Sequence, residues 1–171
     1  MQATLKALSQ GINQFNTAIG YAVAWLGMAM MLVTSLVVFM RYGLNSGSLM
    51  LQDSISYMHA SLFMLGSAYA LQQEAHVRVD IFYRGFSPQT KAWIDSLGAI
   101  IFLLPLCVFL FGVSWHYVAQ SWSIQESSAD AGGIPAVFLL KSLLLAMPVL
   151  LGLQAISQIA SNLVTLLEQE S

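Results

Sequence analysis

Three histidines are the residues of this sequence best suited to hold a redox cofactor, because paired histidines can ligate a haem iron. His59 lies about six residues, or about 9 Å, inside the expected start of its helix, whereas His116 lies only about three residues from the corresponding end of another helix. His76 falls in a polar segment outside the apolar runs. Since no two of them share a depth, we favour a hydrogen-bonded interior His59 and expect no cofactor.

The densest polar cluster is the segment 74–80, Glu-Ala-His-Val-Arg-Val-Asp, in which polar and apolar residues alternate. A catalytic role would need a second cluster facing it, and the sequence offers none. Anchoring explains the residue types better. Arg78 can bind a phospholipid phosphate or the carbonyl end of a partner's helix, and Asp80 can orient Arg78 or cap the next turn.

Two further charges, Asp53 and Lys141, lie about one and two turns inside apolar segments. If both segments are helices, the two side chains have similar depth. An ion pair between them would lower the cost of placing either near lipid. The alternative is that Lys141 alone extends its ammonium group to the lipid headgroups.

Other chemistry is weakly supported. Cys107 lies in an apolar run without a CxxC partner, which favours a small buried or lipid-facing side chain. The sequence contains no phosphate-binding loop and no HExxH motif.

Small multidrug exporters also have four spans, but they depend on a deep acidic residue in the first one. Residues 7–40 contain no charged side chain, so nothing supports a proton-coupled site here.

The composition identifies the environment of these residues. Only 8% of the 171 residues are charged, 57% are hydrophobic, and the mean hydropathy is +0.71. A soluble domain of this size needs more charge on its surface. The net charge of −2 argues against a nucleic-acid partner, which usually requires a basic face. We therefore predict one integral membrane domain over residues 1–171.

Four long uncharged stretches indicate the elements of this domain. They lie between Lys6 and Arg41, Asp53 and Glu74, Asp95 and Glu126, and Lys141 and Glu168, and their lengths are 34, 20, 30 and 26 residues. A membrane-crossing helix needs about 20 apolar residues, so each stretch holds one. In a bilayer the backbone must satisfy its own hydrogen bonds, which favours helices. We predict an all-α fold with spans near 18–41, 50–72, 93–119 and 135–163.

The N-terminal residues 2–16 show helical periodicity of their own. Leucine, isoleucine and phenylalanine recur every three or four residues there, which is one face of a helix. We interpret this segment as an amphipathic helix at the membrane interface, or as an extension of the first span. The first span is too long for the apolar part of a signal peptide, so we expect it to be retained.

Lysine and arginine counts predict the orientation. Four spans place both termini and the 73–92 loop on one side. That side carries Lys6, Arg78, Arg84 and Lys91, against Arg41 and Lys141 on the other. The positive-inside rule puts both termini in the cytoplasm.

Local residues predict where helices start, bend and end. Ser87-Pro88 is a typical helix start, and Pro105 and Pro148 are expected to kink their helices. Residues 132–135 break the chain before the last helix.

Several of these features together resemble the small permease subunit of tripartite ATP-independent periplasmic (TRAP) transporters. The motif residues are Arg41-Tyr42 after the first span, Asp53 at the start of the second, and His76, Arg78 and Asp80 after it. The order, the spacing and the four-span layout agree over nearly the whole chain. The family often has two acids where this chain has Gln52-Asp53.

The resemblance implies a role that composition could not show. A periplasmic substrate-binding protein delivers an organic acid or related solute to a large polytopic permease subunit. That subunit imports the solute with sodium by an elevator motion. The small subunit, in the bacterial inner membrane, is a static scaffold without a catalytic, substrate, metal or cofactor site. Arg41, Arg78, Arg84 and Lys141 would contact phospholipid or the partner. The alternative function is a haem- or quinone-associated membrane anchor of a respiratory enzyme.

Overall fold

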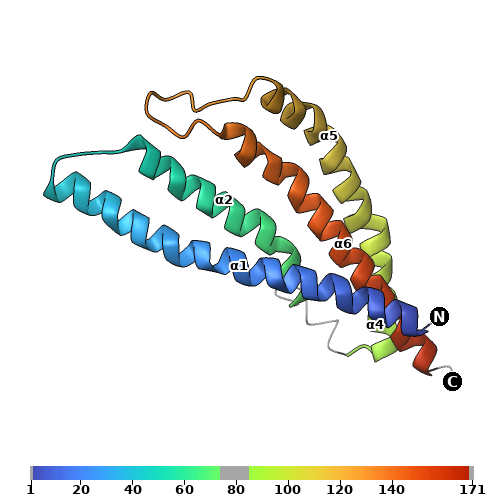
Figure 1. Cartoon of the computed structure of the whole chain (residues 1–171). Helices are drawn as coiled ribbons and strands as arrows, with labels where there is room; N and C mark the ends of the chain where they lie inside the picture. The colour runs from blue at the N-terminus through green and yellow to red at the C-terminus, as the bar shows by residue number, and fades with distance from the viewer. Residues whose placement is uncertain (1, 74–84, 170–171) are drawn as a thin grey trace.

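The described part of the chain, residues 2–73 and 85–169 of a computed structural model, forms a bundle of antiparallel helices (Figure 1). Its regular secondary structure is entirely helical. The elements are α1 (Gln2–Gly43), α2 (Leu49–Gln72), α4 (Pro88–Gly98), a π-helical turn (Ala99–Leu103), α5 (Leu104–Ser123) and α6 (Val137–Gln169). α4, the π-helical turn and α5 follow one another without a break. The predicted all-α fold is therefore confirmed.

Three helices of the described part are long and apolar enough to cross a membrane. They are α1, the continuous helix over residues 88–123, and α6. The first two contain the predicted spans 18–41 and 93–119, and α6 contains all but the first two residues of the predicted span 135–163. The fourth predicted span, 50–72, coincides within one residue with α2, a helix of 24 residues. The uncharged stretches therefore predicted the positions of the helices well, because an apolar segment in lipid must satisfy its backbone hydrogen bonds internally, as a helix does.

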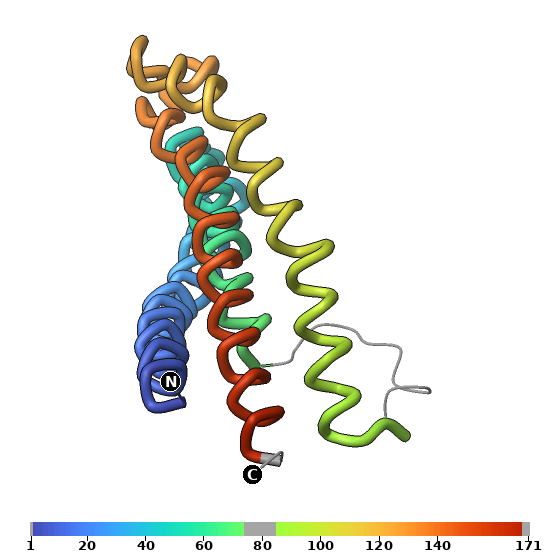
Figure 2. The backbone as a smooth tube through the Cα atoms, turned by 90° about the vertical axis from the view of Figure 1, so that its right-hand side faces the viewer, coloured from blue at the N-terminus to red at the C-terminus, as the bar shows by residue number. Residues whose placement is uncertain are grey.

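α6 is the central helix of the bundle. It packs against α1 and α2 on one side and against α4 and α5 on the other. α1 and α2 form an antiparallel pair, and Figure 2 shows α6 between this pair and α5. The two ends of the chain lie together (Figures 1 and 2), joined by an ion pair of 2.6 Å between Lys6 Nζ and Glu168 Oε1.

The distribution of side chains is the reverse of that in a soluble protein. Most buried apolar residues are small, as at Ala68, Ala99 and Ala155, while Ser9, Asn16 and Gln154 are also buried. Large apolar side chains lie on the outside, including Trp25 and Phe102, which are 75% and 74% exposed. Small residues let helices approach closely, and lipid solvates the large ones. This arrangement supports a multi-pass membrane protein.

The amphipathic segment 2–16 is the first part of α1 and not a separate helix. The segment therefore continues into the first predicted span without a break. α1 has 42 residues and is about 63 Å long, about twice the thickness of a hydrocarbon core. Its apolar face points outward at Leu8 and Phe15, while Ser9 and Asn16 face α6.

The predicted helix start at Ser87-Pro88 is also confirmed. The Ser87 hydroxyl accepts a hydrogen bond of 3.2 Å from the Thr90 amide, which satisfies one free donor of the first turn. The π-helical turn comes just before Pro105. Because proline has no amide hydrogen, it cannot continue the normal hydrogen-bond ladder, and a local change of helix type accommodates this loss. α6 continues through Pro148 as a helix.

Close packing of α1 on α2 provides a test of the fold. A Cβ atom at Gly20 would lie 2.8 Å from Tyr69 Cβ, whereas one at Gly27 would have an ordinary contact of 3.7 Å with Leu62. We expect Gly20→Ala to destabilise the protein by about 1–3 kcal/mol, because the two helices must separate. Gly27→Ala is the control on the same pair of helices and should change stability little. Thermal denaturation in detergent compares them, and equal stabilities would contradict this packing.

Candidate functional site

A buried chain of hydrogen bonds joins α1 to α6. We call Ser9, Asn13 and Asn16 of α1 with Gln154 and Ser157 of α6 the polar seam. Asn16 Nδ2 donates to Gln154 Oε1 at 2.7 Å, and Gln154 Nε2 donates to Asn13 Oδ1 at 3.0 Å. The Ser157 hydroxyl donates to Asn13 Oδ1 at 2.8 Å and lies 2.9 Å from the Ser9 hydroxyl. The seam therefore ties the two helices over two turns of α1.

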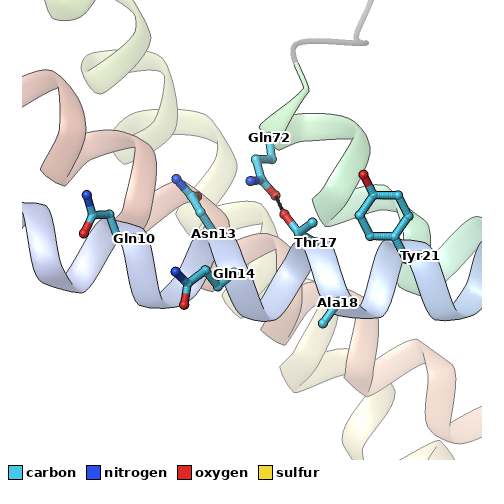
Figure 3. A pocket seen from close by; sticks show the side chains of 7 residues that line it. All are labelled: Gln10, Asn13, Gln14, Thr17, Ala18, Tyr21 and Gln72. Carbon is cyan, nitrogen blue, oxygen red and sulfur yellow. Dashed lines mark hydrogen bonds between the residues drawn. The ribbon is translucent and has the colours of Figure 1, made fainter.

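Asn13 of the seam also lines a polar groove between α1 and the last turn of α2 (Figure 3). Its volume is about 630 Å³, and Gln10, Asn13, Gln14 and Thr17 of α1 line it. Gln72 from the last turn of α2 reaches across to α1, where its Oε1 accepts a 3.2 Å hydrogen bond from the Thr17 hydroxyl (Figure 3). Uncharged amides and hydroxyls of this kind join helices to one another and hold no catalytic charge.

The same end of the bundle has a second polar cleft of about 160 Å³ on α6. Asp95 of α4 and Gln158 of α6 line it, and Asn162 Nδ2 of α6 donates to the Ser96 hydroxyl at 3.2 Å. The polar residues of this region come from α6 itself or from helices that pack on α6. The polar groups therefore gather where the helices converge at the end that carries both chain termini.

At the opposite end, side chains from three helices hold the loop between α5 and α6. We call Asp53, Tyr117, Glu126, Ile134 and Lys141 the loop cluster. Asp53 Oδ2 accepts a 2.9 Å hydrogen bond from the Ile134 amide, and Lys141 Nζ lies 2.5 Å from Glu126 Oε2. The Lys141 ammonium also lies 4.0 Å from the centre of the Tyr117 ring. These contacts fix the loop against the ends of α2, α5 and α6.

The loop cluster corrects one sequence-based prediction. The proposed Asp53–Lys141 ion pair is wrong, because Lys141 pairs with Glu126 and Asp53 binds the Ile134 backbone instead. The chain turns back sharply after α5, which brings Glu126 to the first turn of α6. The hydrogen bond from Lys141 stabilises the Glu126 carboxylate and lowers the pKa of Glu126. This contribution to stability is present at neutral pH and is lost only as the pH falls through that lowered pKa.

The other predicted residues are dispersed. Arg41 and Tyr42 lie in the last turn of α1, and Tyr42 is 80% exposed. Arg41 there complements the partial negative charge of the helix end. The expected interior position of His59 is wrong, because its side chain on α2 is exposed. His116 on α5 is also exposed, and α6 lies between the two helices, so the structure does not bring the two histidines together. His76, Arg78, Asp80 and Arg84 lie outside the described residues.

Sequence reasoning missed the polar seam. The signal was present: Ser9, Asn13 and Asn16 recur every three or four residues on α1, and Gln154 and Ser157 lie three apart just past the middle of α6. The apolar residues of 2–16 predicted the outward face of this segment, whereas the polar residues of its inward face were not used. Within the described residues, no group of three or more His, Cys, Asp or Glu side chains could hold a metal ion.

Comparison with known proteins identifies the family. A family model described as "Tripartite ATP-independent periplasmic transporters, DctQ component" matches residues 30–165, which is most of the chain. The chain belongs to this family. It is therefore a transporter component and a multi-pass membrane protein of the small permease type.

One curated relative is the C4-dicarboxylate TRAP transporter small permease protein DctQ of Vibrio cholerae serotype O1. It is 26% identical over 107 residues, which cover 62% of this chain and 46% of the relative. The matched part of the chain thus spans about half the length of that protein. No solved structure matches the chain.

The loop cluster makes a distinct prediction about energetic coupling. Glu126→Gln and Lys141→Gln should each destabilise the small permease, and their effects should not add, because each removes the same ion pair. Asp53→Ala should cost about 1–3 kcal/mol, since the Ile134 amide loses its acceptor. The destabilisations by Asp53→Ala and Lys141→Gln should be nearly additive, because the two side chains have different partners. Denaturation of the single and double variants measures both couplings. A larger coupling for Asp53–Lys141 than for Glu126–Lys141 would contradict the observed partners.

Proposed function

We propose that this chain is the small transmembrane subunit of a sodium-coupled, binding-protein-dependent transporter for an organic acid or related solute. In this proposal it lies in the bacterial inner membrane as a single domain beside a large permease subunit of the elevator type. A periplasmic binding protein delivers the solute to that large subunit. Family membership supports the transporter role, and the name of the Vibrio relative supports an acidic solute.

The observation that carries a scaffold role is the use of the buried polar groups. Asn16 and Gln154 are 1% and 4% exposed, and they hydrogen-bond to each other across α1 and α6. A helix that binds and releases a solute needs polar groups free to change partners. Here most buried amides and hydroxyls hold helix to helix, so the bundle is suited to remain fixed while a neighbouring subunit moves.

The proposed topology has four spans with both termini in the cytoplasm. α2 would be the fourth span, since it lies antiparallel to α1 and packs against α6. The excess of lysine and arginine on the side of the termini supports the orientation. The 124–136 loop, held by the loop cluster, would then face the periplasm.

Cysteine labelling in intact cells tests the topology. Cys107 is replaced by alanine, and single cysteines are placed at the exposed positions Ala3 and Ser127. We expect a membrane-impermeant maleimide to label Ser127→Cys in intact cells, and to label Ala3→Cys only after permeabilisation. Labelling of Ala3→Cys in intact cells would overturn the orientation, and labelling of both would overturn an even number of spans.

Reconstitution tests the transport role. We expect the small subunit to co-purify with the large subunit, and proteoliposomes containing both to take up the organic acid in the presence of sodium and the binding protein. Without the small subunit, uptake should fall by about tenfold or more, because the large subunit loses its support. Full sodium-dependent uptake by the large subunit alone would refute the scaffold role. A Soret absorbance in the purified chain would instead support a haem anchor.

A further inference from the structure

A row of polar side chains lies exposed on one face of α2. Gln52, Ser56 and His59 are all exposed, and their spacings of four and three residues place them on the same face of the helix. Phe63, four residues further on, continues this face and is 68% exposed. We call Gln52, Ser56 and His59 the α2 stripe. Because its members are exposed, the stripe is turned away from α1 and α6, the helices on which α2 packs.

The depth of His59 makes its exposure costly. His59 lies about 15 Å from the start of α2 at Leu49 and about 20 Å from its end at Gln72. It is also about 9 Å further along α2 than Asp53, which belongs to the loop cluster. With α2 as a span, as proposed above, His59 therefore lies within the hydrocarbon core. Histidines at such depth almost always face another helix or a water-filled cavity.

The His59 ring has no hydrogen-bonding partner among residues 2–73 and 85–169. Exposed hydroxyls in α1 are satisfied locally, since Thr34 and Ser35 each donate to the carbonyl four residues earlier, at 2.7 and 2.9 Å. A neutral histidine ring has one donor and one acceptor, and lipid tails can pair with neither. His59 therefore requires a hydrogen-bonding group from outside this part of the chain.

The composition of α2 agrees with a protein neighbour. With 24 residues α2 is long enough to span a bilayer, but it is not among the three helices of the described part that are also apolar enough. The α2 stripe contributes to this difference. A helix of this kind is stable across a bilayer when protein covers its polar face. The occupant of the stripe is therefore a helix with a polar side chain at the depth of His59, and not lipid.

We propose that the α2 stripe binds a transmembrane helix of the large permease subunit, and that a polar side chain of that helix hydrogen-bonds to His59. The proposal rests on the function proposed above, which places a large subunit beside this chain, and it adds the surface through which the two subunits join. An amide or hydroxyl side chain would supply the missing partner, since either can donate to or accept from the ring.

Removing the hydrogen bond at His59 tests the proposal. His59→Phe keeps a ring but has no donor or acceptor, whereas His59→Gln keeps both. Each variant is expressed with the large subunit and purified through a tag on the small one. We expect His59→Phe to reduce the co-purified large subunit by about fivefold, as for one hydrogen bond between membrane helices, and His59→Gln to retain most of it. Unchanged co-purification of His59→Phe would overturn the proposal.

His116→Phe is the matched control. His116 is also exposed, but it adjoins Tyr117, whose ring lies 4.0 Å from the Lys141 ammonium. At the level of these charged side chains, water and headgroups can solvate a histidine, so we expect His116→Phe to leave co-purification unchanged. An equal loss from both variants would contradict a specific role of His59. A lower thermal stability of the purified His59→Phe chain would assign His59 to internal packing and would also overturn the proposal.

Crosslinking in membranes tests the same surface with His59 in place. In a Cys107→Ala background, Phe63→Cys lies on the face of the α2 stripe, and Phe102→Cys lies just before α5 with similar exposure, 74% against 68%. A photoactivated crosslinker on the thiol should join Phe63→Cys to the large subunit, and Phe102→Cys much less. Crosslinks from Phe63→Cys to lipid alone or to a second copy of this chain would overturn the proposal. If the unaltered pair does not co-purify at all, the proposed function fails as well, so the two failures are distinct.

Discussion

The hydrogen bond between Asn16 and Gln154 is the interaction on which the rest of this bundle depends. In a bilayer, apolar helices gain little by leaving lipid for one another, since both surroundings are apolar. Buried amides are different, because an unpaired amide in hydrocarbon costs several kcal/mol. The polar seam supplies partners for Asn13, Gln154 and Ser157 and for the Nδ2 group of Asn16, whereas the buried Asn16 Oδ1 has none among the described residues. It therefore fixes which faces of α1 and α6 meet, and with them the position of α2 and of both chain ends.

This constraint explains why the two ends of the molecule differ. Near the chain termini, the helices converge on α6 through uncharged polar side chains. At the other end, charged side chains hold the loop between α5 and α6, with Lys141 on Glu126 and Asp53 on the Ile134 amide. Charges suit that end because it lies where water and headgroups can solvate them, whereas neutral amides are tolerated deeper. The scaffold role proposed above would require rigidity at both ends, and the two clusters hold the two ends by different chemistry.

The helices could be predicted from the sequence with useful accuracy, and their contacts could not. α2 lies within one residue of the predicted 50–72, because a long uncharged stretch must satisfy its backbone internally. Ser87 caps its helix as expected, since that bond is local. The predicted Asp53–Lys141 pair was wrong because similar depth in two helices does not make two side chains neighbours, and the turn after α5 brings Glu126 to Lys141 instead. The polar seam was missed although its spacing was visible, because spacing on one helix does not name the helix it faces.

By itself, the sequence determined a membrane protein of long helices, their approximate limits, and membership of the TRAP small permease family through residues 30–165. These properties follow from composition, from local hydrogen bonding and from similarity, all of which are read along the chain. The tertiary structure alone decided that α6 is central, that Lys141 pairs with Glu126, and that α1 turns its apolar face outward at Leu8 and Phe15. Those outcomes depend on contacts that the order of residues does not reveal. Asn16 and Gln154 are 138 positions apart, and even Lys141 and Glu126, 15 positions apart, meet only because the loop after α5 folds back.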